Sequence, residues 1–186
     1  MNMRQRFPDA LIYSFEPLHD CYEELIQAMS GDAKFKSWNV ALGDENSTKE
    51  IQRSSFNPSS SFLTMADLHK KLYPKSSTIT SEVVEQNRLD TIAGEMRLQK
   101  NIMVKIDVQG FEDKVIKGGR ETLSKCDILL IETSFVALYE NQPLFDDIYA
   151  MVRALGFRYY GNSEQHFSRL TDELIYEDSI FIKEKS

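Results

Sequence analysis

The chain has few cysteines and no long apolar run. Its two cysteines, Cys21 and Cys126, lack metal-ligand spacing and are too few for a disulfide scaffold. We interpret both as small core residues in a reducing compartment. No apolar run approaches the roughly 20 residues that cross a bilayer, and residues 1–10 lack the apolar segment of a secretory signal. We therefore expect a cytoplasmic protein that does not contact a membrane.

The sequence also has fewer basic than acidic residues. It holds 22 basic residues against 29 acidic residues, which gives a net charge of -7 and argues against nucleic acid as a partner. The content of charged residues (27%) and of hydrophobic residues (41%) is ordinary for a globular protein of 186 residues. We expect one domain over residues 1–186.

The stretch from Lys105 to Gly119 carries the clearest pattern. An apolar run leads into Asp107, Gly110 interrupts it, and apolar residues then recur at helical spacing. The pattern predicts a buried strand, a tight turn and an amphipathic helix. In an open α/β sheet, ligands bind beyond the carboxyl ends of the strands, so Asp107 is a candidate site residue and Gly110 leaves room for a ligand. The alternative role for Asp107 is to cap the following helix.

Strands and helices are predicted to alternate along the chain, which is typical of an α/β doubly wound sheet. The last two strands suit an antiparallel hairpin at a sheet edge. The predicted strands are 11–15, 35–42, 83–87, 102–108, 128–131, 157–160 and 179–182, and the predicted helices are 21–29, 65–72, 88–92, 111–123 and 144–155.

Two further regions are candidates for a site. Glu16 follows the first predicted strand, where an acidic side chain can accept hydrogen bonds from ribose hydroxyls; the alternative is a solvated turn residue. Residues 45–87 are rich in serine and threonine, and we interpret them as an insertion that is either a substrate lid or a mobile surface loop.

Taken together, these landmarks resemble the FkbM family of S-adenosylmethionine-dependent methyltransferases, from about Phe7 to the carboxyl end. The order and spacing of short pieces carry the resemblance. They are Tyr13-Ser14-Phe15-Glu16-Pro17, Asn39-Val40-Ala41-Leu42-Gly43-Asp44, Ser59-Ser60-Ser61, Arg88-Leu89-Asp90, Lys105-Ile106-Asp107-Val108-Gln109-Gly110, Gly118-Gly119 and Ile131-Glu132.

The resemblance implies a Rossmann-like class I methyltransferase sheet, mostly parallel with an antiparallel carboxyl-terminal strand. It also implies methyl transfer to a hydroxyl of a sugar or secondary metabolite. Glu16 would bind the cofactor ribose, Ala41 and Leu42 would lie beside the adenine with Asp44 nearby, and Asp107 would face the methyl group and the acceptor. No metal is implied.

Asp107 is therefore our candidate for orienting or deprotonating the acceptor hydroxyl. The family pattern usually has Glu where this chain has Gln109, so a charged role at that position is not expected here. Of the three histidines, His69 is the alternative base, although we expect each histidine to lie at the surface.

The sequence departs from the family at its start. No G-x-G pattern precedes Glu16, and only fourteen residues precede Phe15, whereas a strand, glycine loop and helix need roughly 30 residues. We interpret the chain as truncated, with the first strand missing and a gap of about 9.6 Å between its neighbours. We expect this chain alone to bind S-adenosylmethionine weakly or not at all.

Two other functions remain open. The first is a non-catalytic methyltransferase-like module that forms a homo-oligomer through its open sheet edge. The second is a different nucleotide enzyme, such as a sugar-nucleotide transferase. Glu16 would suit that enzyme, but the chain has neither a phosphate-binding glycine loop nor an Asp-x-Asp metal pair.

Overall fold

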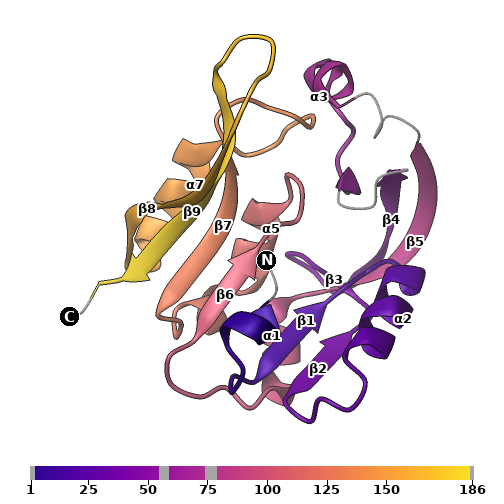
Figure 1. Ribbon diagram of the computed structural model, residues 1–186, viewed down its shortest axis with the longest axis vertical. Helices are drawn as coiled ribbons and strands as arrows, with labels where there is room; N and C mark the ends of the chain where they lie inside the picture. The colour runs from indigo at the N-terminus through magenta and orange to yellow at the C-terminus, as the bar shows by residue number, and fades with distance from the viewer. Residues whose placement is uncertain (1–2, 55–58, 74–78, 185–186) are drawn as a thin grey trace.

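The computed structural model describes residues 3–54, 59–73 and 79–184 and has an α/β fold with mixed sheets (Figure 1). Its strands form three sheets among these residues, with the orders β1-β2, β3-β5-β4 and β6-β7-β9-β8. In Figure 1, β8 and β9 stand on the left, β4 and β5 rise on the right, and β6 and β1 lie in the middle. The prediction of an α/β fold is confirmed, whereas the single continuous sheet is not observed.

The first sheet is a β-α-β unit, as the sequence predicts. Strand β1 (Ile12–Phe15) pairs in parallel with β2 (Phe35–Trp38), and α2 (His19–Ala28) connects them. The short helix α1 (Met3–Arg6) precedes β1, and Arg4 anchors it through an ion pair of 2.7 Å with Asp32.

The predicted strand 35–42 is divided in two. After β2 ends, Asn39 turns the chain, and β3 (Ala41–Leu42) pairs with β5 (Ile79–Asn87) instead of β1. The amide Nδ2 of Asn39 donates to the backbone oxygens of Glu16 (2.8 Å) and Pro17 (3.0 Å). These bonds fix the turn that moves the chain from one sheet to the next.

Much of the predicted insertion 45–87 is regular sheet. Strand β4 (Ser47–Ser54) runs antiparallel to the whole of β5, and α3 (Asp67–Leu72) lies between them in sequence. Interpreting the segment before α3 as a loop was wrong because β4 has one strongly apolar residue, Ile51, and its other residues are polar; all of these except Ser54 are at least partly exposed. Residues 55–58 and 74–78 of the insertion lie outside the described residues.

The third sheet carries the central strand. Strand β6 (Met103–Ile106) pairs in parallel with β7 (Ile128–Ser134), which pairs in antiparallel fashion with β9 (Leu174–Lys183). Strand β8 (Phe157–Phe167) then completes the predicted antiparallel hairpin at the sheet edge.

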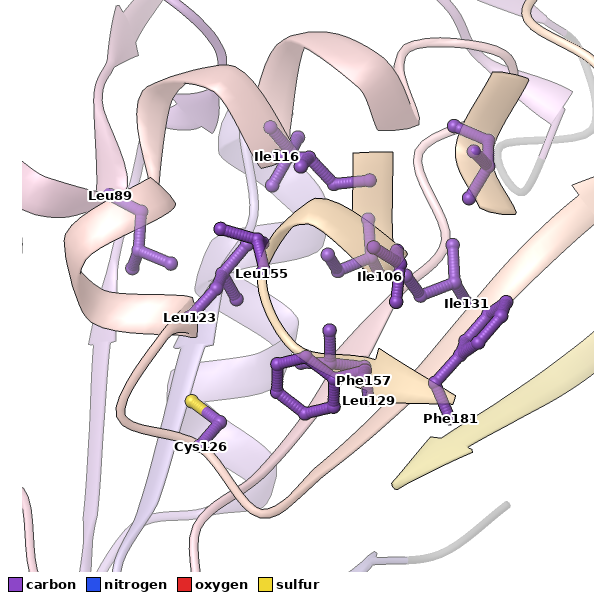
Figure 2. Close-up of a cluster of buried hydrophobic side chains, with 13 residues drawn as sticks. Leu89, Ile106, Ile116, Leu123, Cys126, Leu129, Ile131, Leu155, Phe157 and Phe181 are labelled. Atoms are coloured by element: carbon purple, nitrogen blue, oxygen red, sulfur yellow. The ribbon is translucent and has the colours of Figure 1, made fainter. Parts of the chain in front are cut away.

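Helices α5 (Glu112–Gly118), α6 (Arg120–Leu123) and α7 (Phe145–Ala154) surround the main core (Figure 2). The predicted helix 111–123 is interrupted at Gly119, which separates α5 from α6. Helix α4 (Leu89–Ile92) and the 3₁₀ turn at Ala93–Glu95 pack beside them. Fully buried side chains of this core include Ile116, Leu123, Leu129, Ile131, Val152, Phe157 and Phe181.

The prediction that both cysteines are core residues is confirmed for Cys126 and only partly for Cys21. Cys126 is buried in the main core, and Cys21 is half-buried beside the smaller cluster of Leu18, Ala41, Ile51 and Val84. Within the described residues, no helix is long and apolar enough to cross a membrane.

Candidate functional site

A cavity of about 1150 Å³ lies between β1 and β6. Among the described residues β1 pairs only with β2 and β6 only with β7, so the facing edges of β1 and β6 have no strand partner. The cavity is larger than the roughly 300–1,000 Å³ of common ligand sites because it includes the space between these edges. Side chains of α1 and of the residues after it also line the cavity.

The structure brings together four of the five residues that the sequence proposes. Glu16, Ala41, Leu42 and Asp107 all line the cavity. Asp44 is not among the described residues that line it; its carboxylate instead lies 3.4 Å from Lys114 Nζ, over α5.

Glu16 follows β1 at the mouth of the cavity, at the carboxyl end of the strand as predicted. Its Oε1 accepts a hydrogen bond of 2.9 Å from the backbone N–H of Leu18. Burial raises the pKa of Glu16, and this hydrogen bond opposes the shift. The interpretation as a turn residue is thus compatible with the structure, but the half-buried carboxylate also faces the cavity.

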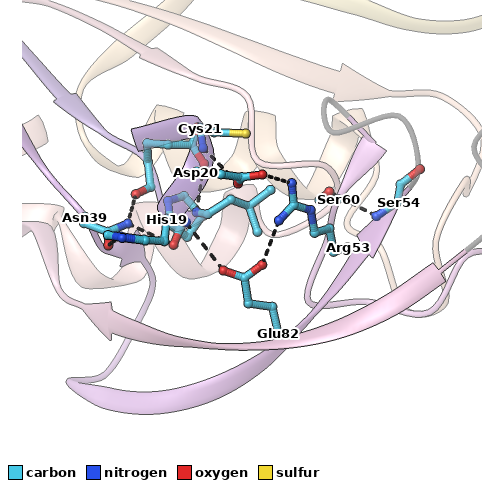
Figure 3. A network of polar contacts seen from close by, with 11 residues as sticks. His19, Asp20, Cys21, Asn39, Arg53, Ser54, Ser60 and Glu82 are labelled. Carbon is cyan, nitrogen blue, oxygen red and sulfur yellow. Dashed lines mark hydrogen bonds and ion pairs between the residues drawn. The ribbon is translucent and has the colours of Figure 1, made fainter. Parts of the chain in front are cut away.

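A polar network supports this turn from outside the cavity (Figure 3). Arg53 of β4 forms ion pairs with Glu82 (3.1 Å) and with Asp20 of α2. The backbone N–H of His19 donates to Glu82 over 3.5 Å. The network therefore ties the start of α2, beside Glu16, to the β4-β5 pair.

Asp107 lies just beyond the end of β6. Its Oδ2 accepts from Lys105 Nζ and its Oδ1 from Gln109 Nε2, both over 2.9 Å. The alternative role of Asp107 as a helix cap is wrong, because Phe111 occupies the N-cap position of α5 and no side chain caps it. Asp107 is thus a partly exposed carboxylate with two side-chain donors at the cavity wall.

The turn after Asp107 has an unusual backbone. Gln109 and Gly110 have φ of 54° and 93°, a region that non-glycine residues seldom adopt. A Cβ on Gly110 would lie 3.1 Å from a Leu63 side-chain carbon and 3.3 Å from Tyr139 and Gln142. From the sequence, we expected Gly110 to leave room for a ligand. Gly110 is not among the residues that line the cavity, so its small size instead allows the turn and its close packing.

Several buried acids lie behind this turn and were not predicted as site residues. Glu112 Oε1 accepts from the backbone N–H groups of Val108 and Gly110, each over 3.1 Å, and burial raises its pKa to about 7. Burial raises the pKa of Glu132 to about 9, and the charge of Asp107 adds to the shift. At neutral pH Glu132 therefore holds a proton.

Only one cation lies among these acids in the described structure. Burial alone would lower the pKa of Lys105, but its hydrogen bond with Asp107 and its charge interactions with the neighbouring acids together outweigh burial and raise the pKa. Lys105 Nζ also lies 3.9 Å from Asp178 of β9, whose pKa is raised by burial. The sequence signal for Glu132 was its place directly after the apolar run 128–131; Asp178 precedes the predicted strand 179–182 and gave no such signal.

The alternative base is not at the cavity. His69 is only 2% exposed and packs against Tyr73 and Tyr139 in a cluster with Met65 and Leu138, so the expectation of a surface residue was wrong. His69 is not among the residues that line the cavity. The described part of the chain contains no group of three or more histidine, cysteine or acidic side chains placed to hold a metal ion.

Comparisons with known proteins identify the family of the chain. A family model described as the methyltransferase FkbM domain matches residues 1–159. The chain is 30% identical over 151 residues to 2-O-methyltransferase NoeI of Sinorhizobium fredii, which covers 73% of this chain and 58% of that protein. The chain therefore spans little more than half the length of this relative.

A solved structure shows the same fold. The crystal structure of methyltransferase FkbM from Methylobacillus flagellatus aligns with a TM-score of 0.50 at 9% identity and covers 91% of this chain and 36% of that one. The family match covers most of the sequence, and the predicted resemblance is confirmed: the chain belongs to the FkbM methyltransferase-domain family.

Proposed function

We propose that the chain is the domain of an O-methyltransferase that uses S-adenosylmethionine to methylate a hydroxyl of a sugar or secondary metabolite. The observation that carries this proposal is the meeting of Glu16, Ala41, Leu42 and Asp107 at one cavity, although they come from three separate parts of the sequence. Family membership and the name of the relative, a 2-O-methyltransferase, support the reaction class.

The cavity wall fits the nucleoside part of this cofactor. The half-buried carboxylate of Glu16 can accept hydrogen bonds from vicinal ribose hydroxyls, as acidic residues at strand ends do in nucleotide-binding sheets. Ala41 and Leu42 offer an apolar surface for the adenine ring. Asp44 would act from outside the cavity wall, where Lys114 now holds its carboxylate.

Bound S-adenosylmethionine supplies an electrophilic methyl group on a sulfonium. The protein must then hold an acceptor hydroxyl in line with that methyl group and remove the hydroxyl proton. Asp107 is our candidate for this role because its carboxylate lies at the cavity wall with its orientation fixed by Lys105 and Gln109.

We propose that the described residues 59–64, which precede α3, cover the acceptor side of the cavity. Ser60 and Phe62 line the cavity, and the Phe62 ring packs 4.9 Å from that of Phe111 at the start of α5. Among the aromatic residues of β8, Tyr159 packs against Phe181 of the core, and Tyr160 is exposed.

We further propose that the fold is a Rossmann-like sheet with a place for one more strand between β1 and β6. Their unpaired facing edges and the cavity between them support this interpretation. A strand in that place would complete the sheet beside the cofactor. We therefore expect weak cofactor binding by this chain alone.

The same open edges favour a second function, a non-catalytic module that forms a homo-oligomer through β1 or β6. Sedimentation equilibrium with and without S-adenosylmethionine separates the two functions. A stable dimer with no affinity for the cofactor would support the module and contradict the enzyme. We propose a cytoplasmic protein with a small-molecule partner in either case, without binding to membranes or nucleic acid.

The proposed reaction is tested by transfer of a radiolabelled methyl group from S-adenosylmethionine to a panel of sugars and hydroxylated metabolites. Because this chain alone should bind the cofactor weakly, the assay uses saturating S-adenosylmethionine and includes the chain extended by the additional strand. The wild-type sequence should label at least one acceptor in this assay, and D107N should lose most of that turnover while it still binds the cofactor. D113N is the matched control, because Asp113 pairs with Lys117 on α5 and is absent from the cavity wall. Full turnover by D107N would refute the role of Asp107.

A further inference from the structure

Gln109 joins four parts of the structure through its own polar atoms. Its Nε2 donates to Asp107 Oδ1 over 2.9 Å and to Glu132 Oε1 over 3.0 Å. Its Oε1 accepts from the Tyr139 hydroxyl over 3.0 Å, and its backbone oxygen accepts from Ser61 Oγ over 2.6 Å. The single amide therefore contacts the ends of both β6 and β7.

These contacts explain the backbone of Gln109. A glutamine with φ of 54° is uncommon and persists only where its surroundings hold it. The bonds from Ser61 and Tyr139 hold the two ends of the residue, and both donors of the amide point to carboxyl groups. The Asp107 carboxylate only accepts hydrogen bonds, so the amide nitrogen of Gln109 must face it. The amide oxygen then faces the Tyr139 hydroxyl, whose single proton is shared with the backbone oxygen of Ser59 at 3.2 Å.

The chemistry of the position requires a neutral donor. Asp107 follows β6, and the other three acids of this group, Glu132, Glu112 and Asp178, belong to β7, α5 and β9. Lys105 is the only lysine or arginine that forms an ion pair with any of them in the described structure. Tyr139 and Tyr176 are the other titratable groups near Glu132. A glutamate at position 109 would add a further carboxylate between two others and would have no N–H to donate.

We propose that Gln109 is a positioning residue, whose amide holds the Asp107 carboxylate at the cavity wall and separates it from Glu132. The proposal rests on the proposed function of Asp107. It assigns a role to the position at which this chain differs from the usual family pattern. Gln109 also lines the cavity, so it stands beside Asp107 where an acceptor would bind.

The geometry is tested first on the chain itself, without cofactor, by NMR of glutamine side-chain amides. The two Nε2 protons of Gln109 should be protected from exchange, and D107N should move their resonances. Gln27, exposed on α2, is the control, and its amide should exchange rapidly and ignore D107N. Gln109 protons that exchange as fast as those of Gln27 would overturn the proposal.

The link to Asp107 is tested by turnover in a double-mutant cycle. Q109A should lower kcat by roughly tenfold or more, because misplaced catalytic groups cost up to about 10²-fold, and should leave the KM for S-adenosylmethionine within about twofold. In the D107N background Q109A should have no further effect. Equal effects of Q109A in both backgrounds would overturn the positioning role.

The two tests separate this proposal from the proposed function. Protected and D107N-sensitive Gln109 protons, together with no turnover at saturating S-adenosylmethionine by this chain or the extended chain, would support the contact and contradict the enzyme.

A further variant tests the need for a neutral donor. Q109E/E132Q keeps the number of carboxyl groups, so it should recover the thermal stability that Q109E loses, but not its turnover. Recovery of both would show that only the charge count matters and would refute positioning.

Discussion

Gly118, at the end of α5, is the position where the smallest change should have the largest effect. A Cβ on Gly118 would overlap the backbone oxygen of Gly43 and would lie 2.9 Å from its carbonyl carbon and 3.2 Å from the Cα of Asp44. All three neighbours are backbone atoms of the turn after β3, so no side chain can rotate away. The substitution G118A must therefore move α5 and this turn apart.

The size of the stability loss in G118A follows from the overlap with the Gly43 backbone. Carbon atoms pack at about 3.5–4.0 Å, so relief of the overlap needs a displacement of roughly 1–2 Å. Overpacking typically costs about 1–3 kcal/mol, and a rigid backbone neighbour places G118A at or above the upper end. The gain in helix propensity, about 1 kcal/mol, does not offset this cost. For a chain of this size, a loss of about 3 kcal/mol lowers Tm by roughly 6–12 °C.

Thermal unfolding of G118A and of a matched control, G94A, tests this reasoning. A Cβ on Gly94 would meet no atom within 4 Å, and its φ is not in the positive range, so G94A should keep or slightly raise Tm. Because the displaced turn follows Ala41 and Leu42, G118A should also weaken cofactor binding. A Tm for G118A within about 1 °C of that of G94A would refute the close approach of α5 to this turn.

The remaining predictions concern the acids and the turn beside Glu16. The pKa of Glu132 is about 9 in the folded chain, whereas the ordinary value is 4.5. Between pH 4.5 and pH 9 the folded state therefore binds more protons than the unfolded state, and the free energy of unfolding falls as pH rises. Glu112, with a pKa of about 7, adds to the fall only up to neutral pH. Urea unfolding from pH 7 to 9 should therefore show a slope of up to about 1.4 kcal/mol per pH unit that E132Q removes; an unchanged slope would contradict a protonated Glu132. N39A and N39D should each lower the free energy of unfolding, measured in urea, by about 1–2 kcal/mol. Both variants lose the Nδ2 group that donates to the backbone oxygens of Glu16 and Pro17. Wild-type stability of N39D would show that these hydrogen bonds contribute nothing.

The sequence predicted the elements that have strong apolar patterns. Strands β1, β6 and β7 and helix α7 were expected close to their observed places, because each carries several apolar residues in a pattern typical of its structure. Strand β4 was missed because its pairing with β5 depends on backbone hydrogen bonds, which leave little trace in a polar sequence.

The site was predictable only where it lies at strand ends. Glu16 and Asp107 follow apolar runs directly, and the carboxyl ends of β1 and β6, which belong to different sheets, meet at one cavity. The contacts of Gln109 with Glu132 and Tyr139 join residues that are 23 and 30 positions apart, and no local pattern encodes them. The packing of Gly118 on Gly43 is likewise a tertiary contact.

The most direct test of the account is a thermal shift titration with S-adenosylmethionine. It uses this chain, a chain with a β-strand and glycine-rich turn added ahead of Met1, and the E16Q variant of the extended chain. A bound cofactor raises Tm by mass action, so an assembled site is detected as a concentration-dependent shift.

The account predicts a clear rise in Tm for the extended chain and a much smaller rise for this chain. The E16Q variant should lose most of the rise, because its side-chain amide has one oxygen and cannot accept hydrogen bonds from both ribose hydroxyls through two oxygens. Equal shifts in E16Q and its parent would contradict the role of Glu16. Absence of a shift in every chain would contradict the claim that this cavity binds S-adenosylmethionine.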